Sequence, residues 1–501
     1  MILKFVLFLI CLRCIVSIDD ILTVTVNPIT VGYPIASDFA SFSYEVACVP
    51  ILFTFNNQSR TSFVNLMNNL RTAAGGSRGP NIRIGGNSAD DSVFLPPNQP
   101  LPINDTYRIQ DSDFQAYLLT VPLFNGTITP GVNFRNSTDP SLAIAHINAL
   151  SSIIPWSSGL VESIEIGNEC DVYYQNGIRP PNYIMNNYIT DFDMYQKAIQ
   201  FSTTIPYPKI QGATFCCRQT TFDAGLPAYI QQYSQSKVLN TISYHEYPLG
   251  NCNKKNELTI YDLLANTAVD RNIPHLTPFI QAAQAAGIPF YIGEGNSISC
   301  GGMLNVSNVF ASALWFADSL FTHAAAFVQR YNIHGCYTQS SIYSAITYPN
   351  LAVDIPDVHP LYYGMWVFAT ATAHNAIIYN TTIQSTNDLI KVWITRDAMN
   401  STWYITAIHK DVNQTENAII TVSFPSGTVN KSIGKLQRLF PINGSPYATS
   451  GLLFGGLTFD GSTDGKPTGT PVSDNVNPNN DGSYTFTVNP TSIAVVSIPT
   501  S

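Results

Sequence analysis

The 501-residue sequence predicts an α/β fold, a (β/α)8 TIM barrel, followed by a C-terminal antiparallel β-sandwich domain. Short apolar runs that are typical of strands alternate with amphipathic helical patterns along most of the chain. Two of these runs end in glycine and glutamate, a pattern that brings an acid to the end of a strand. Beyond about residue 375 the apolar period changes from helical to two, which predicts a separate antiparallel domain.

The first expected strand, Ile21–Val26, alternates apolar and threonine residues, and it is a candidate to join the C-terminal domain. Eight barrel strands are then expected at Phe39–Glu45, Asn81–Gly86, Ile128–Phe134, Glu162–Glu169, Lys209–Thr214, Thr241–Tyr247, Pro289–Glu294 and Ala326–Asn332. Helical patterns separate these strands at Ser62–Leu70, Leu142–Ile154, Tyr183–Ile199 and Val309–Leu320. In a TIM barrel the active site lies at the C-terminal ends of the strands, where both glutamates are expected.

A helix at Leu361–Ala373 is expected to close the barrel. Alternating strands, separated by clusters of Gly, Pro, Asn and Asp, follow at Ile390–Thr395, Thr402–Ile408, Ala418–Phe424, Tyr484–Val488 and Ile493–Ile498. The sequence therefore divides into a signal peptide (1–17), an N-terminal strand segment (18–35), the barrel (36–375) and the β-sandwich domain (376–501).

The N-terminal residues have the pattern of a secretory signal peptide. Lys4 supplies a positive charge, an apolar run extends from Phe5 to Ile10, and the small Ser17 precedes two aspartates. This run is too short to span a bilayer, and no membrane anchor is expected. Asn-X-Ser/Thr sequons begin at Asn57, Asn104, Asn125, Asn136, Asn305, Asn380, Asn400, Asn413 and Asn430. Together these features favour an N-glycosylated protein that is secreted or enters the lumen of the secretory pathway.

Charged residues make up only 11% of the sequence, and the formal net charge is −9. An acidic protein is not attracted to nucleic acid or to an anionic membrane, so neither is expected as the main partner. Removal of the signal peptide leaves seven of the nine cysteines, and none of them has the spacing of metal ligands. We therefore expect one or two disulfides between loops, and no metal. A bridge between Cys300 and Cys336, which follow the neighbouring seventh and eighth strands, is the pairing predicted.

Two glutamates are the strongest candidates for catalytic residues. Glu169 ends the run Ile164–Glu169, and Glu294 lies in the run Tyr291–Ser297. Two carboxyl groups at one end of a barrel can act as general acid and nucleophile on a glycosidic bond. In retaining enzymes such groups lie about 5–5.5 Å apart, and this is the separation that we expect.

The motifs around these residues resemble glycoside hydrolase family 79, the β-glucuronidase and heparanase-like enzymes within the clan A retaining barrels. The similar segments are Ser41–Glu45, Arg83–Asp90, Glu165–Glu169 and Gly293–Ser297. The Gly-Asn-Glu element is shared by the whole clan, whereas the Ile-Gly-Gly-Asn-Ser-Ala-Asp run is more specific to the family. The resemblance covers the chain from the first strand to the C-terminal β domain. It implies a retaining mechanism, no cofactor, and a carbohydrate substrate with a β-linked uronic acid.

The resemblance also implies roles for individual residues. Glu169 matches the acid/base and Glu294 the nucleophile, so donors should hold Glu294 ionised while its charge raises the pKa of Glu169. Asn168 matches the clan residue that hydrogen-bonds the sugar 2-hydroxyl. Tyr247 matches a tyrosine that donates to the nucleophile, and Arg83 could also keep Glu294 charged. Further substrate-binding candidates are His245, Glu45 and Asn87.

The sequence departs from the family beyond Gly293–Ser297. Typical glucuronidases carry a tyrosine a few residues after the nucleophile, and then glycines whose amides help to bind the uronate carboxylate. Here Ser299 or Cys300 replaces the tyrosine, whereas Gly301 and Gly302 keep backbone N–H donors available. This difference bears on the preference for a carboxylate more than on hydrolysis.

Several candidates also have a structural interpretation. The clan's frequent tryptophan on the last strand is not evident, and Arg330 and Tyr331 stand there as carboxylate-binding or structural residues. Arg83 could pair with Glu165 inside the barrel, and His245 could be a buried, hydrogen-bonded ring.

Two other functions remain compatible with the sequence. A retaining β-glycosidase for a neutral sugar is favoured if no donors converge where the C6 carboxylate would bind. A secreted carbohydrate-binding protein without catalysis is the second alternative, and the presence of both glutamates with Asn168 argues against it.

Overall fold

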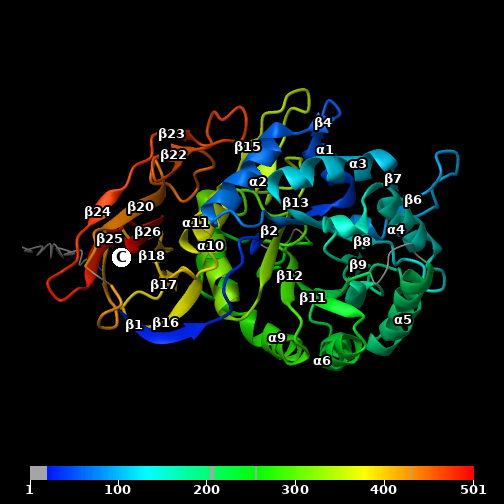
Figure 1. The fold of residues 1–501 in the computed structure, drawn as a ribbon, viewed down its shortest axis with the longest axis horizontal. Helices are drawn as coiled ribbons and strands as arrows, with labels where there is room; N and C mark the ends of the chain where they lie inside the picture. Colours follow the sequence, from blue (N-terminus) through cyan, green and yellow to red (C-terminus); the bar gives the residue numbers. More distant parts are fainter. Residues whose placement is uncertain (1–19, 203–207, 254, 256, 430, 501) are drawn as a thin grey trace, which may run out of the picture.

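The computed structural model describes residues 20–202, 208–253, 255, 257–429 and 431–500 (Figure 1). The predicted signal peptide and the sequon at Asn430 lie outside the described residues. In the described part of the chain, none of the helices combines the length and the apolar character that a membrane span needs.

Eight parallel strands close into a barrel, as the alternating pattern predicts. In chain order they are β2 (Ala40–Glu45), β5 (Asn81–Gly85), β8 (Thr127–Val132), β9 (Ile164–Ile166), β10 (Ile210–Phe215), β11 (Leu239–Glu246), β12 (Phe290–Gly295) and β13 (Arg330–Gly335). The barrel closes through the pairing of β13 with β2. This architecture confirms the predicted TIM barrel.

The last barrel strand begins four residues later than predicted, at Arg330 instead of Ala326. The helix before it continues through Ala325, and the chain then turns with Phe327 in the left-handed conformation (φ 70°). The apolar residues of this turn, Ala326, Phe327 and Val328, resemble the start of a strand in sequence. Each residue of β13 therefore lies closer to the N-terminal end of the barrel than the predicted strand bounds imply.

Helices cover the outside of the barrel (Figure 1). Those near predicted patterns are α2 (Thr61–Ala73), α4 (Ser141–Ile153), α5 (Met185–Ser202), α10 (Phe310–Ala325) and α11 (Pro360–Ala371). The other helices of at least ten residues in the described chain are α3 (Asp111–Thr120), α6 (Thr220–Gln235) and α9 (Ile273–Ala286), and α1 (Val49–Phe53), α7 (Ile260–Leu264) and α8 (Thr267–Asp270) are shorter. Pro227 lies inside α6 and Pro278 inside α9, and proline weakens the expectation of a helix.

A 12-stranded, mostly antiparallel sheet follows the barrel. Seven of its strands have the order β26-β18-β17-β16-β1-β19-β25, with β25 at one edge. The bounds of these strands are β1 (Asp20–Val31), β16 (Ile377–Gln384), β17 (Ile390–Arg396), β18 (Thr402–His409), β19 (Ala418–Ser423), β25 (Tyr484–Val488) and β26 (Ser492–Pro499). The N-terminal strand β1 pairs antiparallel with β16 and parallel with β19, so the beginning of the described chain is part of this sheet. A buried apolar cluster lies between its strands and includes Leu22, Val24, Trp403, Ile420 and Val496.

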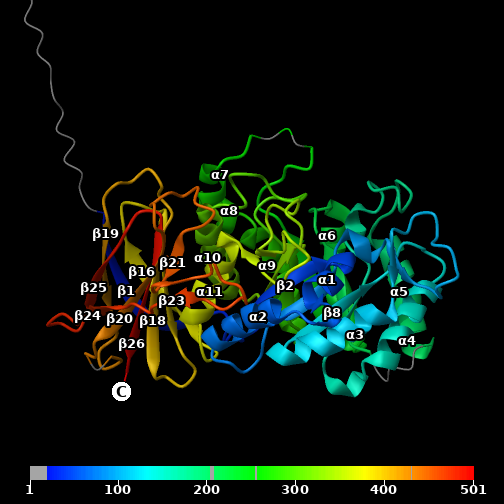
Figure 2. The same cartoon turned by 90° about the horizontal axis from the view of Figure 1, so that it is seen from above.

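The sheet packs against the barrel through α10 and α11, which lie between the two parts (Figure 2). Ile408, Leu439, Ile493 and Val495 on the sheet belong to the same apolar cluster as the barrel interior. A buried ion pair joins Lys410 Nζ of the sheet to a carboxylate oxygen of Asp318 on α10 at 2.7 Å. These contacts fix the sheet to the side of the barrel.

Three disulfides connect described cysteines: Cys48–Cys336, Cys216–Cys217 and Cys252–Cys300. The predicted Cys300–Cys336 bridge is therefore wrong. Cys48 follows β2, which is the other neighbour of β13, so it can reach Cys336. A backbone β-bridge between Leu249 and Ile298 brings the loop after β11, which contains Cys252, alongside the loop after β12, which contains Cys300. Cys170, directly after Glu169, is a buried free thiol.

Candidate active site

Glu169 and Glu294 lie together at the C-terminal ends of the barrel strands. Glu294 is part of β12, and Glu169 follows β9 after a tight turn at Gly167 (φ 75°). A Cβ on Gly167 would approach the Tyr173 hydroxyl to 2.7 Å, so this turn requires glycine. One carboxylate oxygen of Glu169, one of Glu294 and a ring nitrogen of His245 all lie within 4.8 Å of one another. The predicted pair is thus confirmed as a spatial pair.

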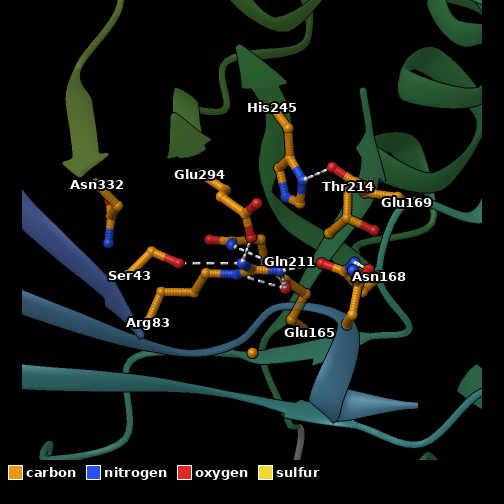
Figure 3. A network of polar contacts seen from close by, with 12 residues as sticks. Ser43, Arg83, Glu165, Asn168, Glu169, Gln211, Thr214, His245, Glu294 and Asn332 are labelled. Carbon is orange, nitrogen blue, oxygen red and sulfur yellow. Dashed lines mark hydrogen bonds and ion pairs between the residues drawn. The ribbon is translucent and has the colours of Figure 1, made fainter. Parts of the chain in front are cut away.

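Arg83 on β5 is fully buried beneath the two glutamates (Figure 3). Its guanidinium donates to one oxygen of Glu165 at 2.5 and 2.8 Å and to Glu294 at 2.6 Å. It also donates to Ser43 Oγ at 3.1 Å and to Asn168 Oδ1 at 2.8 Å. Both interpretations of Arg83, the ion pair with Glu165 and the support of Glu294, are therefore correct. Its assignment as a substrate-binding residue is wrong, because its side chain has no exposed surface.

Glu294 is held in its ionised form. The Tyr247 hydroxyl donates to Glu294 Oε1 at 2.8 Å, while Arg83 donates to Oε2. Burial opposes ionisation, but the positive charges of His334 and Arg83 and the hydroxyl of Tyr247 hold the pKa of Glu294 well below its usual range. A carboxylate of this kind is suited to act as a nucleophile.

Glu169 has the opposite electrostatic environment. Burial, and then the negative charge of Glu294, raise the pKa of Glu169 to about 8. His245 Nδ1 lies 3.1 Å from Glu169 Oε1, and burial lowers the pKa of this ring to about 4, so the ring is neutral at neutral pH. The backbone N–H of Glu169 donates to the Thr214 carbonyl at 2.9 Å. His245 is a buried ring that contacts Glu169, as its structural interpretation predicts, and its role in substrate binding stays a prediction.

His334 on β13 is a site residue that the sequence analysis missed. Its Nδ1 lies 3.5 Å from Glu294 and 3.0 Å from Ser43 Oγ, and its Nε2 lies 3.5 Å from Glu45. Burial opposes protonation, but the charges of Glu294 and Glu45 raise the pKa of the ring. The predicted last strand ends at Asn332, two residues before His334. His334 belongs to the site because β13 begins later and extends to Gly335.

Three predicted polar residues form one side of the site. Glu45 and Asn87 line a pocket beside Glu169 and Glu294. The Ser88 backbone N–H donates to Glu45 at 2.9 Å and fixes its carboxylate. Asn168 Nδ2 donates to Asn87 Oδ1 at 3.1 Å, and only 3% of Asn168 is exposed. These side chains offer acceptors and amide donors of the kind that bind sugar hydroxyls.

Arg330 and Tyr331 do not belong to the site. Arg330 is the first residue of β13 and donates to Asp38 at 2.5 Å and to Glu162 at 3.0 Å, at the N-terminal end of the barrel. The Tyr331 side chain points to the other face of the strand, where it contacts Phe316 of α10 with ring centroids 5.3 Å apart. The prediction that either binds the carboxylate is wrong because β13 begins later than expected.

Gly301 and Gly302 do not line the pocket either, whereas Ser299 and Cys300 do. Gly302 has a φ of 86°, and a Cβ there would lie 3.0 Å from Tyr343. The small size of Gly302 therefore allows Tyr343 to approach and form part of the pocket wall. Gly302 thus has a packing role, whereas a Cβ on Gly301 would have no neighbour closer than 3.8 Å, and the predicted donor role of the two glycines stays a prediction.

The pocket has a volume of about 420 Å³. Both glutamates line it, together with Glu45, Asn87, Cys216, Cys217, Arg218, Tyr247, Pro248, Leu249, Gly250, Cys252, Arg271, Ser299, Cys300, His334 and Tyr343. Cys216–Arg218 and Arg271 line the pocket but are not among the site residues predicted from the sequence. No local motif marks them, because their place depends on the loops after β10 and β11.

Glu169, His245 and Glu294 also form a set of potential metal ligands. Both oxygens of Glu294 already accept hydrogen bonds, one from Tyr247 and the other from Arg83. A cation at this position would lie close to the Arg83 guanidinium and be repelled by it. The arrangement therefore favours acid–base and nucleophilic chemistry by the two carboxyl groups.

The Tyr247→Phe variant tests the support of Glu294. We expect kcat to fall by roughly 10- to 100-fold, because a hydrogen bond to a charged group contributes about 1.5–3 kcal/mol. The acidic limb of the pH profile should also move to higher pH. Steady-state kinetics of hydrolysis measures both effects. Tyr107→Phe is a matched control, since its hydroxyl donates to Asp113 outside the pocket. An equal loss in both variants would contradict the assignment.

No protein-family model matches the chain. A curated protein named β-glucuronidase from Aspergillus niger is 25% identical over 351 residues, covering 64% of this chain and 62% of its own length. A β-glucuronidase from Neurospora crassa is 23% identical over 360 residues, covering 66% and 63%. The chain is similar to these two fungal proteins and spans a little less than two thirds of the length of either. Their names agree with the resemblance to β-glucuronidases that the motifs indicate.

A solved structure gives independent support for the fold. The crystal structure of a 4-O-α-L-rhamnosyl-β-D-glucuronidase from Fusarium oxysporum, in a Rha-GlcA complex, matches with a TM-score of 0.75. The match has 17% sequence identity and covers 95% of this chain and 100% of that chain. At this identity the similarity shows that the two proteins share a fold.

Proposed function

We propose that the protein is a secreted, retaining glycoside hydrolase of family 79 that cleaves β-linked glucuronic acid from glycans or glycoconjugates. The observation that carries this proposal is the pair Glu169 and Glu294. Their nearest oxygens lie within 4.8 Å, and their pKa values are shifted in opposite directions. Retaining enzymes need carboxyl groups about 5–5.5 Å apart, whereas inverting enzymes need about 6.5–9.5 Å to admit a water molecule.

In this mechanism Glu294 attacks the anomeric carbon and forms a glycosyl–enzyme ester. Glu169 gives its proton to the leaving oxygen, and its carboxylate then removes a proton from the water that hydrolyses the ester. Formation of the ester removes the charge of Glu294, and with it one cause of the raised pKa of Glu169. The same residue can therefore act first as an acid and then as a base.

The sugar is proposed to lie over Glu45, Asn87 and Asn168. Asn168 uses one amide hydrogen on Asn87 and has a second that could reach the 2-hydroxyl. His334 lies between Glu45 and Glu294 at the same side of the pocket, so these two carboxylates balance the charge of its protonated ring. The names of the two fungal relatives support the uronate over a neutral sugar, which remains the alternative substrate.

A panel of chromogenic β-glycosides tests this function. The β-glucuronide should be hydrolysed with the highest kcat/KM, and the β-glucoside and β-galactoside much more slowly. A preference for the β-glucoside or β-galactoside would instead indicate a β-glycosidase that acts on a neutral sugar. Absence of hydrolysis of every glycoside would instead support a carbohydrate-binding protein.

We also propose that the protein is secreted and N-glycosylated, with the domain division predicted from the sequence and a C-terminal β-sandwich. The sheet curls around one apolar interior, which supports the sandwich.

Three disulfides favour an oxidising compartment. All eight described sequon asparagines are exposed, and none lines the pocket. Mass spectrometry of the secreted protein, before and after removal of N-glycans, tests both statements.

The pH dependence follows from the two carboxyl groups. Glu169 must be protonated in the first step, so kcat/KM should fall as the pH rises above about 8. Glu294 must be ionised, and its low pKa places the acidic limb below the usual range of a glutamate. The profile is measured with a glycoside that has a poor leaving group. A maximum at strongly alkaline pH would contradict this assignment of the general acid.

A further inference from the structure

The pocket extends beyond the place of the sugar, and its two halves differ in charge. The strands β9, which leads to Glu169, and β12, which carries Glu294, divide the barrel into two halves. The first half consists of β10 and β11. The second half consists of β8, β5, β2 and β13. The second half contributes Glu45, Asn87 and His334 to the pocket. The first half contributes the loops after β10 and β11, with Arg218 and Arg271.

This division places the two parts of a substrate. The hydroxyl-binding groups Glu45 and Asn87 lie in the half formed by β2 and β5, so the sugar belongs there. The acid Glu169 protonates the oxygen that links the sugar to the leaving group. The leaving group therefore extends over the loops that follow β10 and β11.

Two guanidinium groups line this half. Arg218 and Arg271 are exposed, and neither forms an ion pair with a carboxylate among the residues that the structure describes. Arg218 donates to Asn272 Oδ1, and Arg271 donates to the Pro248 carbonyl at 3.0 Å. Guanidinium groups donate strong hydrogen bonds to carboxylates and other anions.

Arg218 is held in place from behind. Its partner Asn272 is buried and donates from Nδ2 to Glu246 at 2.7 Å. Glu246 in turn contacts His323 Nε2 at 2.5 Å. Arg218 itself has a φ of 54°, a left-handed conformation that is uncommon for a residue with a side chain and is often found at functional sites. The side chain is therefore positioned before any ligand binds.

The Cys216–Cys217 disulfide lines the same pocket as Glu169 and Arg218. The backbone N–H groups of both cysteines donate to the buried carboxylate of Asp171, at 3.0 to 3.3 Å. These hydrogen bonds fix the loop, and the disulfide presents a small apolar surface next to the acid. A ring of the leaving group can pack on that surface while a charged substituent reaches the arginines.

We propose that Cys216, Cys217, Arg218 and Arg271 form the binding site for the leaving group, and that this site selects leaving groups that carry a carboxylate or another anionic substituent. The proposal rests on the proposed function, because it uses the direction in which Glu169 delivers its proton. It specifies the chemical class of the leaving group, which is the part of the substrate beyond the bond that is cleaved.

The test uses two aryl glycosides whose phenol carries either a carboxylate or the isosteric carboxamide. Their sugar is the one that the wild-type protein hydrolyses best in the chromogenic panel. The wild-type protein should prefer the carboxylate, measured as the ratio of the two kcat/KM values. In Arg218→Gln and Arg271→Gln this ratio should fall by roughly 10- to 100-fold, as expected for loss of a charge-assisted hydrogen bond.

Arg438→Gln, which removes one arginine from the C-terminal sheet, is the matched control and should keep the wild-type ratio. Arg218→Lys should retain part of the preference, and added salt should reduce the preference of the wild-type protein. Equal losses on both substrates in Arg218→Gln and Arg271→Gln would overturn the proposal, because the arginines would then act on the sugar. If no glycoside is hydrolysed by the wild-type protein, the proposed function and this site fail together. If hydrolysis occurs without a carboxylate preference, only this site fails.

Discussion

Glu294→Gln should remove turnover for every substrate, however good its leaving group. Without the carboxylate no glycosyl–enzyme ester can form, and loss of a catalytic nucleophile typically lowers kcat by about 10⁵- to 10⁶-fold. Glutamine keeps the size of the side chain, but its single carbonyl oxygen can accept from only one of Tyr247 and Arg83, which bind different oxygens of Glu294. Steady-state kinetics with an activated aryl glycoside and with a natural glycoside measures the loss in both.

A control separates this effect from general damage to the barrel. Glu162→Gln removes a carboxylate at the opposite end, where it binds Arg330 at 3.0 Å, and should keep the wild-type kcat. A 2-fluoro glycoside with a good leaving group should label the wild-type protein on the peptide that contains Glu294. Labelling of another residue, or substantial turnover by Glu294→Gln, would remove Glu294 from the role of nucleophile.

The sequence predicts the barrel well because each of its strands is a short apolar run bounded by loops. The proximity of Glu169 and Glu294 was also predictable, since Gly167 and Gly293 mark the ends of two strands where acids emerge. The sequence pattern does not fix where each strand begins, and therefore does not fix the height of a side chain along the barrel. Arg330 was assigned to the C-terminal end of the last strand, but it is the first residue of β13 and lies at the other end of the barrel.

Contacts between distant parts of the chain account for most of what the sequence analysis missed. Arg83 and Glu294 are 211 residues apart in sequence, and His334 reaches Glu45 only because β13 closes the barrel against β2. The place of Cys216 in the pocket depends on the buried carboxylate of Asp171, which holds its loop. Such features follow from barrel closure and loop conformation, and no short motif records them.

Glu169→Gln should affect substrates unequally, and this distinguishes an acid/base from a nucleophile. With an activated aryl leaving group little proton donation is needed, so Glu294 can still form the ester. The second step then lacks its general base, and the ester should accumulate with a burst of released phenol. A glycoside with a poor leaving group should lose about 10²- to 10⁴-fold in kcat/KM, the usual contribution of general acid catalysis.

Azide provides the decisive comparison between the two glutamates. It attacks the ester without giving up a proton, so it should restore turnover of the activated substrate in Glu169→Gln and yield a β-glycosyl azide. It should restore nothing in Glu294→Gln, where no ester forms. The variant should also lose the alkaline limb near pH 8, because that limb reports Glu169. Rescue of neither variant, or equal losses on both substrates, would contradict the assignment of Glu169. Because the raised pKa of Glu169 depends partly on the charge of Glu294, the two carboxyl groups act as one coupled unit.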